Sequence, residues 1–475
     1  MDEQTLKKIE EQSKVAPLSP VKDMTDFRDT WRVFRIMAEL IEGYNFLVDL
    51  KKEVTIFGSA RFSEHHAYYK VARNLGKLLG KNGFITITGG GPGIMEAANR
   101  GAFEAGGESI GLNIQLPLEQ RTNPYVKKSA GFNYFFTRKV MLTSPANAFV
   151  FFPGGFGTLD EFFEVVDLID LNMLTPAPIV LVGKKFWQPI LDFIRGQCVP
   201  VGSVREEQVS LWHLVDTADE AFAHMKDVGD VMEICDLSPN NFHCKGNIDW
   251  KIFQVMAELV EGFDFVTGMN HAVTVLGTKS ITMESPYFAA AHALGQQLAQ
   301  HGYSVVTGGK FGIAEAANKG AFEAGGTSIG IGMRVGRVGA DVNPYLSKSI
   351  LFQFPFTRKL IMGAPTKAFV FFPGGLGTMH QLFEVLTLMQ TKKMERLPVV
   401  LYDAVFWEPL QDFIHEVLIK KLKTIAPGDG DLFRIVDDVS EIITLVETSH
   451  SAGHWESLAM PRFSNGAPLP RPASV

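Results

Sequence analysis

The stretch Ala148–Glu164, AFVFFPGGFGTLDEFFE, decides the fold. Its apolar run Ala148–Phe152 is typical of a buried strand in a parallel sheet. The strand breaks at Pro153-Gly154-Gly155, and we expect a helix from about Thr158. A strand that leads through a glycine turn into a helix presents unpaired backbone N–H groups at one point, where a phosphate can bind.

Two carboxylates, Asp160 and Glu161, fall in the expected first turn of this helix. One interpretation is a capping box from Thr158 to Glu161, in which the glutamate only bonds back to the N-cap amide. The other is chemistry, because an anion site does not need carboxylates for binding.

The chain contains this stretch twice, and the second copy distinguishes the two interpretations. Ala368–Thr378, AFVFFPGGLGT, differs from Ala148–Thr158 at one position in eleven. Where the first copy has Glu161, the second has Gln381. Glutamine can cap a helix but cannot act as a base. We therefore expect one working site and one copy that has lost its chemistry.

Strands alternate with helices along each copy, and every glycine turn follows a strand. In the first copy these turns are Gly58-Ser59-Ala60-Arg61, Gly89-Gly90-Gly91-Pro92-Gly93 and Pro153-Gly154-Gly155. The pattern predicts the α/β class, with a doubly wound parallel sheet and a ligand at the carboxyl ends of its strands. The turns do not match the dinucleotide pattern G-x-G-x-x-G.

The repeat begins at about Phe242, at an offset of 219 that becomes 220 after a one-residue insertion near 337–341. Ala316–Gly330 matches Ala97–Gly111 with two differences in fifteen. Amphipathic helices near Trp31 and Trp250 begin the two copies. We predict a flexible arm (1–25), a first domain (26–237), a linker (238–246), a second domain (247–448) and a disordered tail (449–475).

Composition excludes several classes of protein. Of 475 residues, 46% are hydrophobic and 20% charged, and the net charge of −7 argues against nucleic acid as a partner. No apolar run approaches the ~20 residues that cross a bilayer, and the charged start does not resemble a signal peptide. Cys198, Cys235 and Cys244 are too few for a disulfide framework, and His243 beside the last two makes a poor metal site. We expect a cytoplasmic protein with no membrane partner and no metal.

Two other candidate segments can be compared between the copies, one unchanged and one changed. Arg138-Lys139 follows Thr137 near an expected helix start, where cations oppose the helix dipole unless an anion binds between them. An anion between them explains the pair more easily than the alternative, two solvated basic residues. The pair persists as Arg358-Lys359, so the second copy could also hold an anion. In the second glycine turn, Gly91-Pro92 becomes Lys310-Phe311, which obstructs close approach of a ligand.

The motifs Gly89-Gly90-Gly91-Pro92-Gly93-Ile94-Met95-Glu96, Arg138-Lys139 and PGGFGTLDE (153–161) resemble the signature of the Lonely Guy family. The last matches the family pattern PGGxGTxxE in full, and the second copy does not. The resemblance covers about 51–225 and, with the failed motif, 272–448. It implies a Rossmann-like fold and hydrolysis of a nucleoside 5′-monophosphate to free base and ribose 5-phosphate. Plant members act on cytokinin ribotides and bacterial relatives on ordinary nucleotides, and many carry a lysine decarboxylase label.

By the same resemblance Arg138 and Glu161 are the catalytic pair, and Asp160 or Glu164 supports them. Gly154, Gly155, Gly157 and Thr158 would cradle the 5′-phosphate, and the second turn would border the nucleotide. The predicted binding positions are Gly58, Ser59, Gly89, Gly90, Gly91, Gly93, Glu96, Lys139, Gly154, Gly155, Gly157 and Thr158.

Two other functions stay open. The protein could be a non-catalytic carrier of a nucleotide-like ligand, as are the molybdenum-cofactor carriers of this fold. A pyridoxal-phosphate decarboxylase would need Lys139 as its Schiff-base lysine, with a pyridinium partner that the sequence does not show. We expect no cofactor. Because family members resemble homodimers, we predict that the two copies form a pseudo-dimer within one chain, open to further association of whole chains.

Overall fold

The computed structural model describes residues 25–47, 50–115, 122–228, 248–269, 271–334 and 342–448. The predicted arm, linker and tail lie outside these ranges apart from Thr25, as do Cys235, His243 and Cys244. The domain boundaries stay a prediction.

The first copy forms one sheet of seven strands, all paired in parallel, in the order β4-β3-β2-β1-β5-β6-β7. The strands are β1 (Glu53–Phe57), β2 (Ile85–Thr88), β3 (Ser109–Ile114), β4 (Lys128–Phe132), β5 (Ala148–Phe151), β6 (Ile179–Val182) and β7 (Trp212–Val215). The helices are α2 (Thr25–Leu47), α3 (Ala67–Lys81), α4 (Ile94–Glu104), α5 (Phe135–Thr143), α6 (Phe156–Asp170), α7 (Lys184–Phe193), α8 (Glu206–Ser210) and α9 (Ala218–Ala223), with a π-helical turn η1 (Ile194–Cys198) after α7.

The second copy repeats this sheet in the order β11-β10-β9-β8-β12-β13-β14. Its strands are β8 (Ala272–Leu276), β9 (Ser304–Thr307), β10 (Ser328–Met333), β11 (Lys348–Phe352), β12 (Thr366–Phe371), β13 (Val399–Tyr402) and β14 (Arg434–Val436). Its helices are α10 (Ile248–Val266), α11 (Pro286–Gln300), α12 (Ile313–Glu323), α13 (Pro355–Gly363), α14 (Leu376–Gln390), α15 (Ala404–Asp412) and α16 (Val439–Thr448), with η3 (Phe413–Lys421) and η4 (Pro427–Asp431). The prediction of two tandem doubly wound parallel sheets is confirmed.

The strand order places the glycine turns where a ligand can reach them. β1 and β5 are the central neighbours, and every residue of both strands is buried because helices cover the sheet. The chain leaves β1 toward β2 and leaves β5 toward β6, so the order reverses between β1 and β5. Ligands of doubly wound sheets bind at such a reversal, outside the carboxyl ends of the strands. Gly58 directly follows β1 and the turn at Pro153 follows β5, so both turns lie at this reversal.

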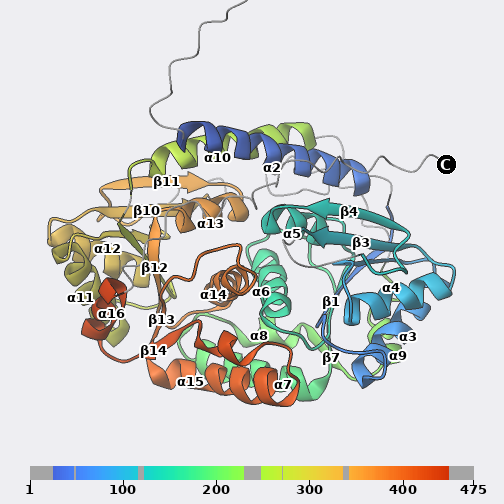
Figure 1. The fold of residues 1–475 in the computed structure, drawn as a ribbon. Helices are drawn as coiled ribbons and strands as arrows, with labels where there is room; N and C mark the ends of the chain where they lie inside the picture. The colour runs from blue at the N-terminus through green and yellow to red at the C-terminus, as the bar shows by residue number, and fades with distance from the viewer. Residues whose placement is uncertain are drawn as a thin grey trace, which may run out of the picture.

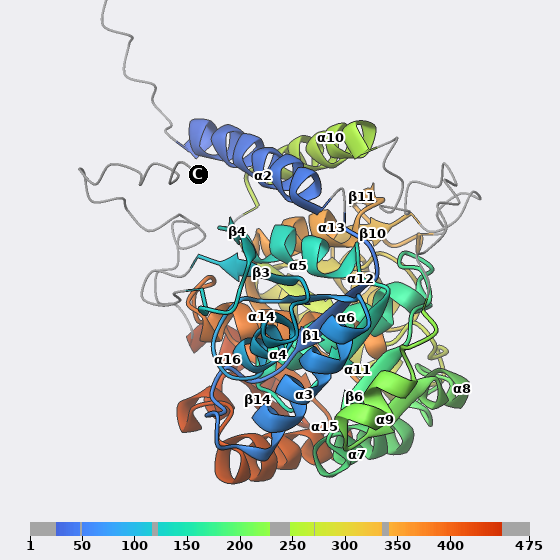
Figure 2. The ribbon, with the colours of Figure 1, turned by 90° about the vertical axis from the view of Figure 1, so that its right-hand side faces the viewer.

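Apolar side chains join the two copies into one body. One continuous cluster of buried residues includes members of both sheets, while two smaller clusters each lie on the other face of one sheet. Helices α6 and α14 pack against each other between the sheets (Figure 1). Helices α2 and α10 lie side by side at one end of the molecule, and α7 and α15 at the other (Figures 1 and 2).

The contacts between the copies are reciprocal, as a twofold arrangement requires. Phe186 contacts Phe413 at a centroid distance of 5.4 Å, and the equivalent pair Phe193 and Phe406 meets at 5.6 Å. Phe136 stacks on its own equivalent, Phe356, at 5.6 Å. The two halves are therefore related by a pseudo-twofold axis that passes between equivalent residues.

Candidate active site

Three turns of the first copy meet at one point. The Ser59 N–H donates to the Pro153 carbonyl oxygen over 3.0 Å, and the Ile94 N–H donates to the Ser59 carbonyl oxygen over 3.0 Å. A Cβ at Gly93, whose φ is +70°, would collide with that same carbonyl, so glycine is required. The turns after β1, β2 and β5 thus form one continuous rim.

Asn123 holds the second glycine turn in shape. Its Nδ2 donates to the carbonyl oxygens of Gly90 and Gly91, each over 3.1 Å, and to Asn99 Oδ1 over 3.0 Å. On the other side, the Gly90 N–H donates to Thr88 Oγ1 over 2.9 Å. The turn is therefore preorganised by buried side chains from three segments.

Arg138 lies against this glycine turn. Its Nε donates to the Leu112 carbonyl oxygen over 2.8 Å, which fixes the plane of the guanidinium group. A Cβ at Gly89 would collide with Arg138 Nη2, so the guanidinium lies directly over the turn. Burial lowers the pKa of Arg138, while Glu161 and Asp160 oppose that shift.

Glu161 is the partner of Arg138, at 3.5 Å between Oε1 and Nη1. Burial raises the pKa of Glu161 to about 7, against the opposing effects of Arg138 and Lys139. A carboxyl group with a pKa near neutral pH suits a general base or acid.

The capping-box interpretation of Glu161 is wrong. Helix α6 begins at Phe156, not at Thr158, and its N-cap is Gly155, which has extended backbone and makes no side-chain cap. Asp160 and Glu161 therefore lie beyond the first turn, where no N-cap amide is within reach. Thr137 does not cap α5 either, because that helix begins at Phe135 and follows Tyr134.

Lys139 has carboxylate partners of its own. Its Nζ lies 2.7 Å from Asp160 Oδ1 and 3.1 Å from Glu164 Oε2, and its side chain is 3% exposed. Burial lowers the pKa of Lys139, but Asp160, Glu164 and Glu384 outweigh it and the net shift is upward. Burial raises the pKa of Asp160 to about 7, although Lys139 opposes the shift. Two carboxylates therefore hold the ammonium group that the sequence assigned to phosphate binding.

A segment of the second half of the chain packs against the turn after β5. Within the turn, a Cβ at Gly154 would collide with Thr158 Oγ1. A Cβ at Gly155 would lie 2.8 Å from Ile425 Cγ2 and 3.1 Å from the Thr424 carbonyl oxygen. Nearby, Arg61 Nη1 donates to the Lys423 carbonyl oxygen over 3.3 Å. The site therefore lies at the junction of the two copies.

The remaining predicted positions support the rim. A Cβ at Gly58 would lie 2.8 Å from Ile94 Cγ2, so this glycine allows α4 to approach β1. Ser59 is buried and its Oγ accepts from the Arg61 N–H over 3.1 Å. Glu96 Oε1 accepts from the Tyr69 hydroxyl over 2.8 Å.

The sequence analysis missed Asn113, at the end of β3. This side chain is 8% exposed, its Nδ2 has no hydrogen-bond partner among the described residues, and a Cβ at Gly90 would collide with it. The equivalent residue of the second copy is Gly332. Comparison of the repeats could have found Asn113, because its neighbours Gly111 and Ser109 are unchanged.

The second copy keeps the frame of the site and loses its carboxylate. Arg358 Nε donates to the Ile331 carbonyl oxygen over 2.8 Å, as Arg138 does to Leu112. Lys359 Nζ lies 2.7 Å from Glu384 Oε2 and 2.8 Å from His380 Nε2, so His380 replaces Asp160. Gln381 replaces Glu161, and its Oε1 has no hydrogen-bond partner within the described ranges.

The described residues were compared with the requirements of a metal site and of a membrane-spanning helix. They contain no cluster of three or more His, Cys, Asp or Glu side chains arranged to hold a metal ion. No helix among them has the length and apolar character needed to span a membrane.

Fold and candidate site define an α/β protein in which glycine turns meet a buried carboxylate–guanidinium pair. The family described as "Possible lysine decarboxylase" matches residues 95–225 and 314–446, together more than half of the chain, and the chain belongs to that family.

Curated relatives carry a more specific name. A cytokinin riboside 5′-monophosphate phosphoribohydrolase of Rhodococcoides fascians is 24% identical over 151 residues, which span 31% of this chain and 76% of the relative. The enzyme of that name called LOG in Oryza sativa subsp. japonica is 30% identical over 155 residues, 32% of this chain and 62% of the relative. LOG1 of Arabidopsis thaliana is 27% identical over 148 residues, 30% of this chain and 68% of the relative.

Among solved structures, the molybdenum cofactor carrier protein of Chlamydomonas reinhardtii is similar at 22% identity and a TM-score of 0.30, over 38% of this chain and 98% of that one. The molybdenum cofactor binding protein of Rippkaea orientalis gives the same identity, TM-score and coverage. A TM-score of 0.30 supports no statement about function.

Proposed function

We propose that the first half of this protein hydrolyses the N-glycosidic bond of a nucleoside 5′-monophosphate, releasing the free base and ribose 5-phosphate. The observation that carries the proposal is the pair of Glu161 and Arg138, 3.5 Å apart, beside two glycine turns. The named activity of the curated relatives supports it.

The chemistry follows from where each group lies. Water attacks C1′ of the ribose, the bond from C1′ to the base nitrogen breaks, and its electron pair leaves with the base, which takes up a proton from water to become the free base. Positive charge develops on the ribose, which an ionised Glu161 stabilises while it accepts the proton of the attacking water. The carboxyl pKa of about 7 keeps a large fraction ionised at neutral pH.

Arg138 assists the departing base in this scheme. Its guanidinium lies over Gly89 in the turn that would border the nucleotide, not in the turn after β5. From there it can donate a hydrogen bond to the base as negative charge develops on it. The 5′-phosphate would bind at the start of α6, where the first backbone N–H groups have no partner in the helix.

Lysine decarboxylation through pyridoxal phosphate does not suit these residues. A Schiff base requires a neutral and accessible amine. Lys139 is buried, ion-paired with Asp160 and Glu164, and its pKa is raised. The family name therefore does not describe the chemistry of this site.

Incubation of the full chain with a panel of nucleoside 5′-monophosphates, cytokinin ribotides included, tests the proposal. Free base and ribose 5-phosphate should appear in equal amounts. Glu161→Gln should reduce turnover at least about a hundredfold, the low end of a general acid–base contribution, with the melting temperature nearly unchanged. The matched control is Gln381→Ala in the second copy, which should leave turnover intact.

A protein that binds nucleotides but releases no base from any of them would contradict the proposal, and would favour a carrier instead. An active Glu161→Gln variant would show that the carboxylate is not the catalytic group.

A further inference from the structure

The rim of three glycine turns is repeated in the second half. The Thr278 N–H donates to the Pro373 carbonyl oxygen over 2.9 Å, and the Ile313 N–H donates to the Thr278 carbonyl oxygen over 3.1 Å. A Cβ at Gly312, whose φ is +69°, would collide with that same carbonyl. The second half therefore keeps the backbone frame of a ligand site, although it lacks the carboxylate of the first.

The glycine turn after β9 also keeps its shape, although Lys310 and Phe311 replace a glycine and a proline. The Asn343 N–H donates to the Gly309 carbonyl oxygen over 2.9 Å. Asn343 Nδ2 donates to the Lys310 carbonyl oxygen over 2.9 Å and to Asn318 Oδ1 over 3.0 Å. The Phe311 side chain is 48% exposed. The bulk predicted to obstruct a ligand therefore lies at the surface of the turn, where an aromatic ring can stack on a base.

The guanidinium group of Arg358 lies over this turn, as that of Arg138 does in the first half. A Cβ at Gly308 would lie 3.0 Å from Arg358 Nη2. Among the described residues no carboxylate forms an ion pair with Arg358, whereas Arg138 has Glu161 at 3.5 Å. Burial lowers the pKa of Arg358 to about 10, and the charge of Asp167 on the opposite half opposes that shift. A buried cation with so little compensation favours an anionic ligand.

The charges around the two arginine–lysine pairs differ between the halves. In the second half Lys359 contacts Glu384 and His380. Burial lowers the pKa of His380 well below its usual value, so this ring is neutral at physiological pH. Asp167 Oδ2 lies 3.0 Å from His380 Nδ1, and burial raises the Asp167 pKa to about 7, so this carboxylate is only partly ionised at neutral pH. The pair of the first half meets three carboxylates, so the second pocket is the more positive; the three are Glu161, Asp160 and Glu164.

Gln381 stands on α14 at the position that Glu161 takes on α6. Both helices begin one residue after an extended glycine N-cap, Gly155 in α6 and Gly375 in α14. Gln381 Oε1 is buried and has no hydrogen-bond partner within the described ranges. The amide can bond to a ligand but takes up no proton at neutral pH, so Gln381 cannot replace the general base proposed for the first half.

We propose that the second half binds a nucleoside 5′-monophosphate and leaves it intact, with Arg358 and Gln381 at the positions from which Arg138 and Glu161 act on the substrate. The phosphate of this ligand carries about two negative charges at neutral pH, which suits the more positive pocket. The glycosidic bond survives because no carboxylate stands where Glu161 activates water. The inference rests on the proposed function only in the class of the ligand.

Equilibrium dialysis of the full-length Glu161→Gln chain with radiolabelled AMP, GMP, CMP, UMP or a cytokinin ribotide tests the inference, because this variant should not consume the nucleotide. At least one nucleotide should bind at two sites per chain. Arg358→Gln, added to this chain, should lower the count to one. Arg138→Gln, the matched change in the first half, should also lower it to one. Gln381→Glu, which gives Arg358 the carboxylate that Arg138 has, should weaken one of the two sites at least about tenfold.

A count of one or less for every nucleotide would overturn the inference, as would a count of two that Arg358→Gln leaves unchanged. If Arg358→Gln fails to fold, Gln381→Glu decides, and an unchanged affinity at both sites would contradict the inference. Inorganic phosphate that displaces the nucleotide from the second site at equal concentration would show a site for phosphate alone, and would also overturn it.

Release of base by the wild-type chain is measured separately. A protein that releases base but has a single nucleotide site refutes the inference alone. A protein with two nucleotide sites that releases no base refutes the hydrolase function alone.

Discussion

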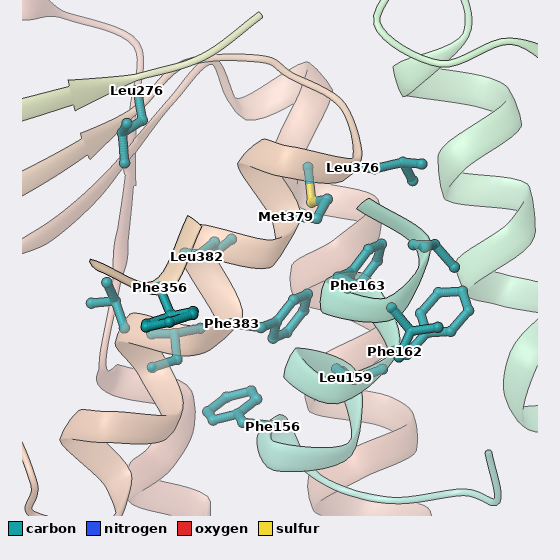
Figure 3. Close-up of a cluster of buried hydrophobic side chains, with 14 of the residues drawn as sticks. Phe156, Leu159, Phe162, Phe163, Leu276, Phe356, Leu376, Met379, Leu382 and Phe383 are labelled. Atoms are coloured by element: carbon teal, nitrogen blue, oxygen red, sulfur yellow. The ribbon is translucent and has the colours of Figure 1, made fainter. Parts of the chain in front are cut away.

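Phe163 and Phe383 occupy equivalent positions in the two copies, and their rings stack face to face with centroids 5.4 Å apart and planes 2° apart (Figure 3). Both side chains are fully buried. Phe156 adds a further contact to Phe383 at 6.1 Å. The pseudo-twofold axis therefore runs through the packed aromatic layer between α14 and α6, the helix that also carries Glu161.

This stacking predicts that Phe383→Ala destabilises the first copy as well as the second. Deletion of a buried phenyl ring costs about 3–5 kcal/mol. Chemical denaturation of the full chain measures the loss, and the base-release assay should show reduced activity although Glu161 is untouched. Leu211→Ala is the matched control, because Leu211 is 68% exposed and its truncation should change stability by no more than about 0.5 kcal/mol. Equal stability of the two variants would contradict the shared core.

The first copy alone, expressed as Met1–Pro239, should not be an active monomer. Without α14 its Phe156 and Phe163 would face water, so the fragment should dimerise or lose solubility. Light scattering and the base-release assay check both statements, and an active monomer would contradict them.

The pH dependence of turnover should report Glu161. Its pKa is raised to about 7, chiefly by burial, so the ionised form dominates above that pH and disappears below it. If the carboxylate is the working form, kcat should rise through an apparent pKa near 7 and fall about tenfold per pH unit at lower pH. The residual activity of Glu161→Gln should lack this step. A rate that falls as the pH rises through 7 would instead make Glu161 a proton donor.

Asn113 should contribute to substrate binding. Its Nδ2 is a buried donor without a partner among the described residues, and it lies against Gly90. Asn113→Asp keeps the shape and removes the donor, so KM for the nucleotide should rise about tenfold, the value of one hydrogen bond, while kcat changes little. An unchanged KM would show that Asn113 only packs against the turn.

Local sequence patterns predicted the elements that local forces determine. The buried strand predicted at Ala148–Phe152 is confirmed as β5, which ends one residue earlier, and the strand, turn and helix order around Pro153 is confirmed. The start of α6 was wrong by two residues, because Gly155 serves as N-cap through its backbone and needs no polar side chain. Strand β4 was missed because its residues KSAGF are mostly exposed and lack an apolar alternation.

The features that arise between distant segments left no local signal. The polar groups at the start of α5 are bound by Glu39, which lies almost a hundred residues earlier in the chain. Its carboxylate accepts from the Asn133 N–H over 2.8 Å and from Thr137 Oγ1 over 2.6 Å. Likewise, Thr387 and the Thr424–Ile425 segment reach the first site only through the packing of the two halves. The sequence predicted that the halves would pair, but not which residues they would exchange.

The loop Lys423–Ile425 that covers Gly155 has a consequence for the history of this gene. If only the first site is active, the second half can lose its own carboxylates, yet mutations at the positions that face the first site alter a pocket encoded elsewhere in the chain. Selection would then act in opposite ways on two surfaces of the same copy, tolerating changes inside its own pocket and opposing changes on the side turned toward its neighbour.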